Sequence, residues 1–185
     1  MNDSRSIYLL PGSGGTMNKG LGAELSRRGY TLYGRETVGE FGSLRFDEQI
    51  SIVADDLQEH FWQSNARVIA NSYGAYLFLH AQASMPPFVG RVLLLSPIVG
   101  AIDDEHSFRQ FVPPRSDKLK QLAADGKLPV PSRIEIHVGE HDWQSLPAEV
   151  TKLGNALGIP VSVVPGQGHR LDPAYVSGLL DKWLD

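Results

Sequence analysis

Residues 68–74 read VIANSYG, an apolar run that ends in Ser72 with a glycine two positions later. A serine at this place is typical of two structures. It can cap a helix, because its hydroxyl accepts a hydrogen bond from a backbone N–H group of the first turn. It can also be a nucleophile on a sharp strand-to-helix turn, which requires small residues two positions before and after it. Ala70 and Gly74 are both small, so the heptapeptide allows either structure.

The composition is that of one globular domain. The chain has 185 residues, of which 42% are apolar and 21% charged, with a formal net charge of −4. We therefore expect a single domain over residues 1–185. No basic tract suggests nucleic acid or an anionic membrane surface as a partner. The apolar run before Pro11 is too short for a signal peptide, and no stretch approaches a membrane span. We expect a cytoplasmic protein.

Short β-type runs alternate with longer helical stretches, and several of the runs are continuously apolar, as in strands covered on both faces. The predicted strands are Ile7–Leu10, Thr31–Tyr33, Arg67–Ala70, Val92–Leu95, Ile134–Val138 and Val161–Val164. The predicted helices cover 16–29, 47–63, 73–84, 116–125, 146–157 and a last segment that opens at Asp172-Pro173. This alternation predicts an α/β fold, with a mainly parallel sheet of about six strands and helices on both faces.

The predicted helix over 47–63 has the clearest periodicity. Its apolar residues at 50, 53, 54, 57 and 61 recur on one stripe. Asp47 is expected to cap its N-terminus. His60 and His80 are expected at helix surfaces, and Trp183 is expected in the core.

The loop after the first predicted strand is rich in glycine, since residues 11–16 read PGSGGT. Such a turn between a strand and a helix can hold phosphate, or it can simply make a tight turn. Neither phosphate-binding pattern fits. Met17 stands where the dinucleotide pattern requires glycine, and Lys19 lacks the neighbours of a P-loop lysine.

Function in a parallel sheet collects at the carboxyl ends of the strands. Asp142 follows the strand that ends at Val138, and His169 follows the strand that ends at Val164. A serine hydroxyl needs a base such as imidazole, and the imidazole needs a carboxylate that fixes its tautomer. Asp142 alone could be a turn residue and His169 a surface histidine. Together, Ser72, Asp142 and His169 follow strand candidates in the chain order of an α/β-hydrolase triad.

The chain resembles the α/β-hydrolase superfamily over nearly its whole length. The resemblance runs from IYLLPGSGG at 7–15, through VIANSYGAYL at 68–77 and IEIHVGEHD at 134–142, to VVPGQGH at 163–169. Within the superfamily the chain is most similar to small, compact serine hydrolases such as retinoblastoma-binding protein 9 and its bacterial relatives. This resemblance implies a three-layer α/β-hydrolase fold without a large lid.

The resemblance also implies a role for each site residue. Ser72 would be the nucleophile, His169 the general base and then acid, and Asp142 the orienting carboxylate. The backbone N–H groups of Ser13 and Tyr73 would form the oxyanion hole, which binds charge that develops only in the transition state.

Three features depart from the superfamily pattern. Ala70 replaces the first glycine of the nucleophile elbow, the sharp strand-to-helix turn that carries the serine. Pro11 replaces the histidine of the loop after the first strand, which carries an oxyanion donor. Neither glycine nor histidine is chemically required at these positions. The third departure is length, because only residues 97–115 are available as a cover. This segment is too short for a lid domain, and it suggests a mobile flap over an open, shallow site.

Other residues near the predicted site are alternatives or neighbours. Asp103 is the rival acid, because some family members place it after the fourth strand. His141 is expected to be a turn histidine. Phe108, Phe111 and Trp143 lie beside site segments and could line a substrate pocket, although such aromatic residues more often serve packing.

The expected activity is that of a carboxylesterase-like serine hydrolase that cleaves carboxylic esters or thioesters of small soluble substrates. No cofactor is expected. The sequence has no cysteine and no metal-ligand spacing, so no metal is expected either. Two alternatives remain open. The same triad supports lyases and acyltransferases, and a catalytically silent protein-binding module would keep the fold without the reaction.

Overall fold

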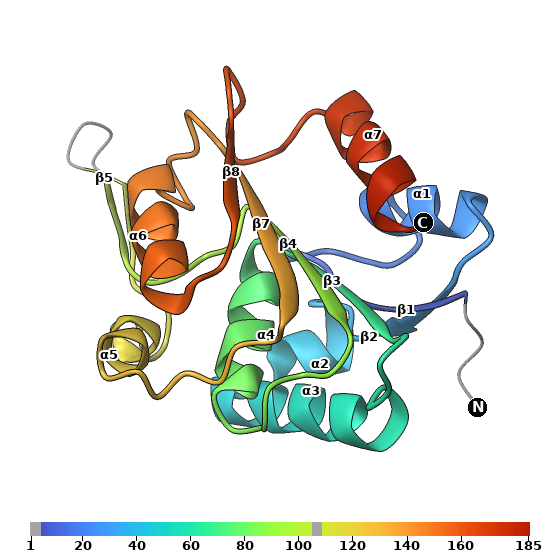
Figure 1. Ribbon diagram of the computed structural model, residues 1–185, viewed down its shortest axis with the longest axis horizontal. Coiled ribbons are helices and arrows are strands. Elements are labelled where there is room, and N and C mark those ends of the chain that lie inside the picture. The colour runs from blue at the N-terminus through green and yellow to red at the C-terminus, as the bar shows by residue number, and fades with distance from the viewer. Residues whose placement is uncertain (1–4, 105–108) are drawn as a thin grey trace.

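The computed structural model describes residues 5–104 and 109–185. Its centre is a six-stranded sheet in the order β2-β1-β3-β4-β7-β8, with every neighbouring pair parallel (Figure 1). The strands are β1 (Ser6–Leu10), β2 (Thr31–Gly34), β3 (Arg67–Asn71), β4 (Arg91–Leu95), β7 (Arg133–Gly139) and β8 (Val161–Val164). The predicted parallel sheet and its strands are confirmed, with small differences at the strand ends.

Helices cover both faces of the sheet (Figure 1). One face carries α1 (Gly20–Arg27) and α7 (Pro173–Trp183). The other face carries α3 (Phe46–His60), α4 (Tyr73–Gln82) and α6 (Pro147–Leu157), with α5 (Lys118–Ala124) packed against α6. A short helix, α2 (Gly39–Ser43), precedes α3. Within the described ranges, no helix combines the length and the apolar character needed to cross a bilayer.

The strands contribute to both cores because successive side chains of a strand point to opposite faces. In β1, Tyr8 and Leu10 belong to the core beneath α3 and α4, whereas Ile7 and Leu9 belong to the core beneath α1 and α7. All four side chains are at most 1% exposed. This burial on two faces explains why the strand sequences are continuously apolar rather than alternating.

One short helix and one antiparallel strand pair have no counterpart among the elements predicted from the sequence: α2, and the pair of β5 (Ile102–Asp104) and β6 (Arg109–Phe111). α2 is only five residues long and holds two glycines, so it has no helical periodicity to detect. The pair β5-β6 lies within 97–115, the segment predicted to be a flap. Part of that segment is therefore regular structure, and residues 105–108 lie outside the described ranges.

The start of α3 differs from the prediction. The helix begins at Phe46 and its N-cap is Arg45, so the prediction that Asp47 caps it is wrong. The Arg45 backbone N–H donates to the Glu48 carboxylate at 3.0 Å. Asp47 lies in the first turn, where a negative charge interacts favourably with the helix dipole. The predicted apolar stripe is correct, since its five members are at most 6% exposed.

His80 lies in the core rather than at the helix surface, so that prediction is also wrong. Its side chain is 4% exposed, and its ring centroid lies 5.1 Å from that of Phe46 and 4.4 Å from that of Tyr76. Burial, together with the positive charge of Arg115, lowers the pKa of His80 to about 4. Its Nε2 atom has no hydrogen-bond partner among the described residues.

We expect this buried histidine to destabilise the protein in mild acid. The pKa of His80 is about 4 in the folded protein and roughly 6.5 in an unfolded chain. Below pH 6.5 the unfolded state therefore binds the proton first. Neutral His80 therefore makes its full contribution to the free energy of unfolding above pH 6.5. This contribution is lost as the pH falls toward 4, and the loss is about 2 kcal/mol at pH 5.

Urea unfolding at pH 7 and pH 5 measures this loss. In His80→Gln, which cannot titrate, the difference between the two pH values should shrink by about 2 kcal/mol. An unchanged difference in the variant would show that other groups cause the acid sensitivity.

Candidate active site

Ser72 is the single residue between β3 and α4. Its φ of 52° and ψ of −116° lie where L-residues are rarely found. It occupies the N-cap position of α4, but its hydroxyl makes no capping hydrogen bond. The backbone holds this conformation from two sides. The Ser72 N–H donates to the Leu95 carbonyl at 2.9 Å, and the Ser72 carbonyl accepts from the Tyr76 N–H at 3.2 Å.

Small residues surround Ser72 because other chain segments approach it closely. A Cβ atom at Gly74 would lie 2.2 Å from the carbonyl oxygen of Leu10, so a side chain cannot fit there. A Cβ atom at Gly12 would lie 3.2 Å from that of Ser72. Ala70 is fully buried in β3, in register with Leu10 of β1. The methyl group at the first elbow position is therefore compatible with the turn.

The structure brings the three predicted triad side chains into one hydrogen-bonded chain. Ser72 Oγ lies 2.8 Å from His169 Nε2. His169 Nδ1 lies 2.9 and 3.0 Å from the two carboxylate oxygens of Asp142. An ionised carboxylate can only accept hydrogen bonds, so Nδ1 carries the proton and donates a hydrogen bond to Asp142. Nε2 is then free to accept the hydrogen bond from the Ser72 hydroxyl.

Asp142 is held from several sides. It is 2% exposed, and its Oδ1 atom accepts from the backbone N–H groups of Gln144 at 2.9 Å and Ser145 at 2.8 Å. The fully buried Ser145 hydroxyl donates to the Ser96 carbonyl at 2.6 Å and lies 3.4 Å from His169 Nδ1. Ser145 is not among the residues predicted from the sequence, because a contact between residues 49 positions apart leaves no local pattern.

The loops that carry Asp142 and His169 touch through their backbones. The His141 N–H donates to the Gln167 carbonyl at 2.8 Å. A Cβ atom at Gly139 would lie 2.3 Å from the Gly168 carbonyl oxygen, so only glycine permits this approach. The side chain of His141 itself is 69% exposed, as expected for a turn histidine.

The two predicted oxyanion donors lie on opposite sides of Ser72 in the chain. Tyr73 is the first residue of α4, where N–H groups have no partner within the helix. Ser13 follows Gly12, which adjoins Ser72. Over residues 5–104 and 109–185, the structure gives neither N–H group a hydrogen-bond acceptor. No other group of the described chain therefore occupies either N–H group.

The predicted pocket residues have different surroundings. Phe111 is 46% exposed on β6, and Trp143 is partly buried against the core beneath α4. Phe108 lies outside the described residues. The rival acid, Asp103, belongs to β5. His169 contacts Asp142 directly.

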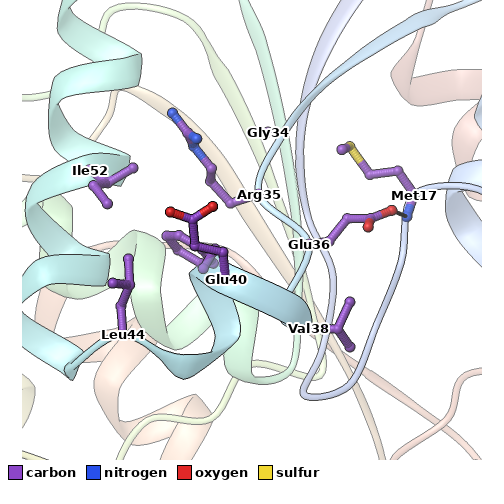
Figure 2. A pocket seen from close by; sticks show the side chains of 9 residues that line it. Met17, Gly34, Arg35, Glu36, Val38, Glu40, Leu44 and Ile52 are labelled. Carbon is purple, nitrogen blue, oxygen red and sulfur yellow. Dashed lines mark hydrogen bonds between the residues drawn. The ribbon is translucent and has the colours of Figure 1, made fainter.

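Two clefts lie outside this arrangement. One has a volume of about 380 Å³ and lies between the end of β2, α2 and α3 (Figure 2). The second, of about 610 Å³, lies at residues 112–121. Neither is lined by Ser72, Asp142 or His169. The described part of the chain holds no cluster of three or more acidic or histidine side chains that could bind a metal.

No protein-family model and no curated protein sequence matches this chain. Solved structures do match it. A monoacylglycerol lipase from Paleococcus ferrophilus has a TM-score of 0.71 at 14% identity, over 97% of this chain and 93% of the lipase. Mouse alpha/beta hydrolase domain-containing protein 10 has a TM-score of 0.70 at 13% identity, over 100% and 91%. The chain has the α/β-hydrolase fold. A Bacillus subtilis carboxylesterase matches as well, with a TM-score of 0.66 at 16% identity, over 100% and 85%.

The α/β-hydrolase fold explains why these side chains meet. Ligands of open parallel sheets bind beyond the carboxyl ends of the strands. Ser72, Asp142 and His169 follow β3, β7 and β8 at that edge. Strand β4 lies between β3 and β7, and two carbonyl groups at its end support the site. The Leu95 carbonyl accepts from the Ser72 N–H, and the Ser96 carbonyl accepts from the Ser145 hydroxyl.

We expect that no side chain larger than that of glycine fits at position 74. Gly74→Ala should lower the free energy of unfolding by about 3 kcal/mol or more, because backbone atoms block its methyl group. Gly178→Ala is the matched control, since a Cβ atom in that part of α7 meets nothing within 4 Å. It should stabilise the protein by up to about 1 kcal/mol. Urea unfolding compares the two, and equal stabilities would contradict the described packing.

Proposed function

We propose that the protein is a serine hydrolase that cleaves carboxylic esters or thioesters of small soluble substrates. One observation carries the proposal. The hydroxyl of Ser72, on a strained strand-to-helix turn, lies 2.8 Å from His169 Nε2. The other ring nitrogen of His169, Nδ1, contacts the buried carboxylate of Asp142. This arrangement can activate a serine, which is otherwise a poor nucleophile.

In the acylation step, the Ser72 oxygen attacks the substrate carbonyl carbon while His169 Nε2 takes the hydroxyl proton. Asp142 stabilises the imidazolium through Nδ1–H. The oxyanion of the tetrahedral intermediate accepts hydrogen bonds from the Ser13 and Tyr73 N–H groups. When the intermediate collapses, the bond to the leaving oxygen or sulfur breaks. His169 gives its proton to that atom, and an alcohol or thiol departs from the acyl-enzyme.

In the second step, water replaces the alcohol. His169 Nε2 takes a proton from water, and the resulting hydroxide attacks the acyl carbon on Ser72. The second tetrahedral intermediate uses the same two N–H groups. Its collapse breaks the bond to the Ser72 oxygen, which recovers its proton from His169, and the carboxylic acid leaves. Every proton is transferred within this set of groups, so the reaction needs no cofactor.

The site and proteins of similar fold support the proposed substrate class. Those proteins include a carboxylesterase and a monoacylglycerol lipase, whose names describe ester substrates. Only residues 97–115 separate β4 from the segment that leads into α5, and this leaves little chain to enclose a long acyl group. A short acyl chain and an accessible leaving group suit such a site.

The first test asks whether Ser72 is activated. A fluorophosphonate probe phosphonylates activated serines, and peptide mass spectrometry locates the adduct. We expect one adduct, on Ser72, that is absent in Ser72→Ala and reduced at least a hundredfold in rate in His169→Ala. Ser26→Ala is the matched control, because Ser26 is an exposed serine of α1. It should label like the wild type.

The probe result has two consequences. An adduct on Ser72 supports the proposal and justifies a panel of p-nitrophenyl esters and acyl thioesters of increasing chain length. A folded wild-type protein that gives no adduct, beside a known serine hydrolase that reacts, would contradict the proposal. A protein-binding module would then be favoured.

The identity of the acid is tested separately. Asp142→Asn should lower kcat for p-nitrophenyl acetate by roughly 10⁴-fold, because an amide can no longer stabilise the imidazolium or fix the histidine tautomer. Asp103→Asn is the same chemical change at the rival position and should leave kcat within about twofold of the wild type. A larger loss in Asp103→Asn than in Asp142→Asn would reverse the assignment.

A further inference from the structure

The glycine-rich loop at residues 11–16, which carries Ser13, is held by hydrogen bonds from a segment distant in sequence. Thr37 follows β2 and makes three hydrogen bonds with this loop. Its hydroxyl donates to the Gly12 carbonyl and accepts from the Gly15 N–H at 3.0 Å, and its own N–H donates to the Gly15 carbonyl at 3.2 Å. Thr37 thus holds the loop immediately before and two residues after Ser13.

The contact at Gly12 acts directly on the N–H group of Ser13. The Gly12 carbonyl and the Ser13 N–H belong to one planar trans peptide unit, in which the two groups point in opposite directions. A hydrogen bond from Thr37 to that carbonyl oxygen fixes the rotation of the whole unit. The Ser13 N–H is therefore turned away from Thr37, and Gly12 adjoins Ser72.

The loop has little freedom elsewhere. The Gly15 N–H also donates to the Gly12 carbonyl at 2.9 Å, which closes a tight turn around Ser13. A Cβ atom at Gly15 would lie 2.6 Å from that of Pro11. Within this turn, Thr37 bonds to the carbonyl of the peptide unit between Gly12 and Ser13 and to both backbone groups of Gly15.

The two residues that precede Thr37, Arg35 and Glu36, are themselves held by hydrogen bonds to other parts of the chain. Arg35 donates to both oxygens of Asp56 at 2.7 and 2.6 Å, and Asp56 also accepts from the Tyr8 hydroxyl at 2.6 Å. Glu36 accepts from the Met17 N–H at 2.8 Å. Figure 2 shows the Arg35 and Glu36 side chains leaving the chain in different directions, with Glu36 directed at the Met17 backbone. The backbone immediately before Thr37 is therefore fixed in position.

We propose that Thr37 is a positioning residue for the oxyanion hole, acting through the Gly12–Ser13 peptide unit. This inference rests on the proposed function, because it concerns how the same site stabilises the transition state. Preorganised donors lower the barrier only when they already point at the place where charge develops. A purely structural contact would stabilise the fold without changing the ratio of transition-state to substrate binding.

The variants that test the proposal are Thr37→Val, which removes the hydroxyl at nearly constant volume, and Thr37→Ser, which restores it. Thr31→Val is the matched control, because it makes the same change at an exposed threonine that begins β2, at the other end of the strand from Thr37. Hydrolysis of p-nitrophenyl acetate gives kcat and KM. Inhibition by a trifluoromethyl ketone, which adds to the serine as a tetrahedral oxyanion, measures transition-state binding.

In Thr37→Val we expect kcat to fall about 10- to 100-fold while KM changes less than about threefold. The inhibition constant of the ketone should rise by the same factor as kcat/KM falls, because both report binding of the oxyanion. Thr37→Ser should recover most of the loss, and Thr31→Val should match the wild type. Amide exchange at Gly15 should be faster in Thr37→Val, which reads the loosened loop without any activity.

The outcomes separate the two proposals. An active wild type, together with a folded Thr37→Val variant of unchanged kcat and unchanged ketone inhibition, would overturn the inference and leave the proposed function standing. A wild type without an adduct on Ser72 would overturn the proposed function and this inference with it. If Thr37→Val does not fold, Thr37→Ala replaces it in the same comparison.

Discussion

The chain leaves β3 and enters α4 through Ser72 alone, and this abrupt change of direction constrains much of what surrounds it. A φ of 52° at a residue with a side chain requires support, which comes from the Leu95 carbonyl on one side and the first turn of α4 on the other. The same turn brings α4 so close to the end of β1 that position 74 has no room for a Cβ atom. A single backbone conformation thus determines where the serine points, which residues may flank it and which strand lies beside it.

The remaining site residues are positioned by backbone contacts between loops rather than by side-chain packing. The acid and histidine loops meet through Gly139, and Asp142 accepts two backbone N–H groups besides the imidazole. Such contacts depend on strand spacing and register, which a parallel sheet fixes accurately. Loop residues that make none of these contacts can therefore differ while the distance between Ser72 and His169 is kept, whereas Gly139 cannot.

How far the sequence alone predicts this structure depends on the range of the interactions involved. The strands are predictable because burial on both faces makes them continuously apolar, as in β1 and β4. The order of Ser72, Asp142 and His169 is equally visible along the chain. The short helix α2 is not, because its two glycines give no periodicity. His80 is misplaced because α4 is buried on nearly all sides, so a single polar residue does not mark a surface. The contacts of Thr37 and Ser145 join distant residues and have no local sequence pattern at all.

Under the proposed function, stability and activity make opposite demands on position 72 of the strained turn. Glycine adopts positive φ values readily, so a glycine at 72 would relieve the backbone while removing the hydroxyl that we propose as the nucleophile. Variation screened only for thermal stability would therefore tend to replace Ser72, and under the proposed function the most stable members of such a library would be inert. Any attempt to evolve a more robust form of this protein has to select for turnover at every round.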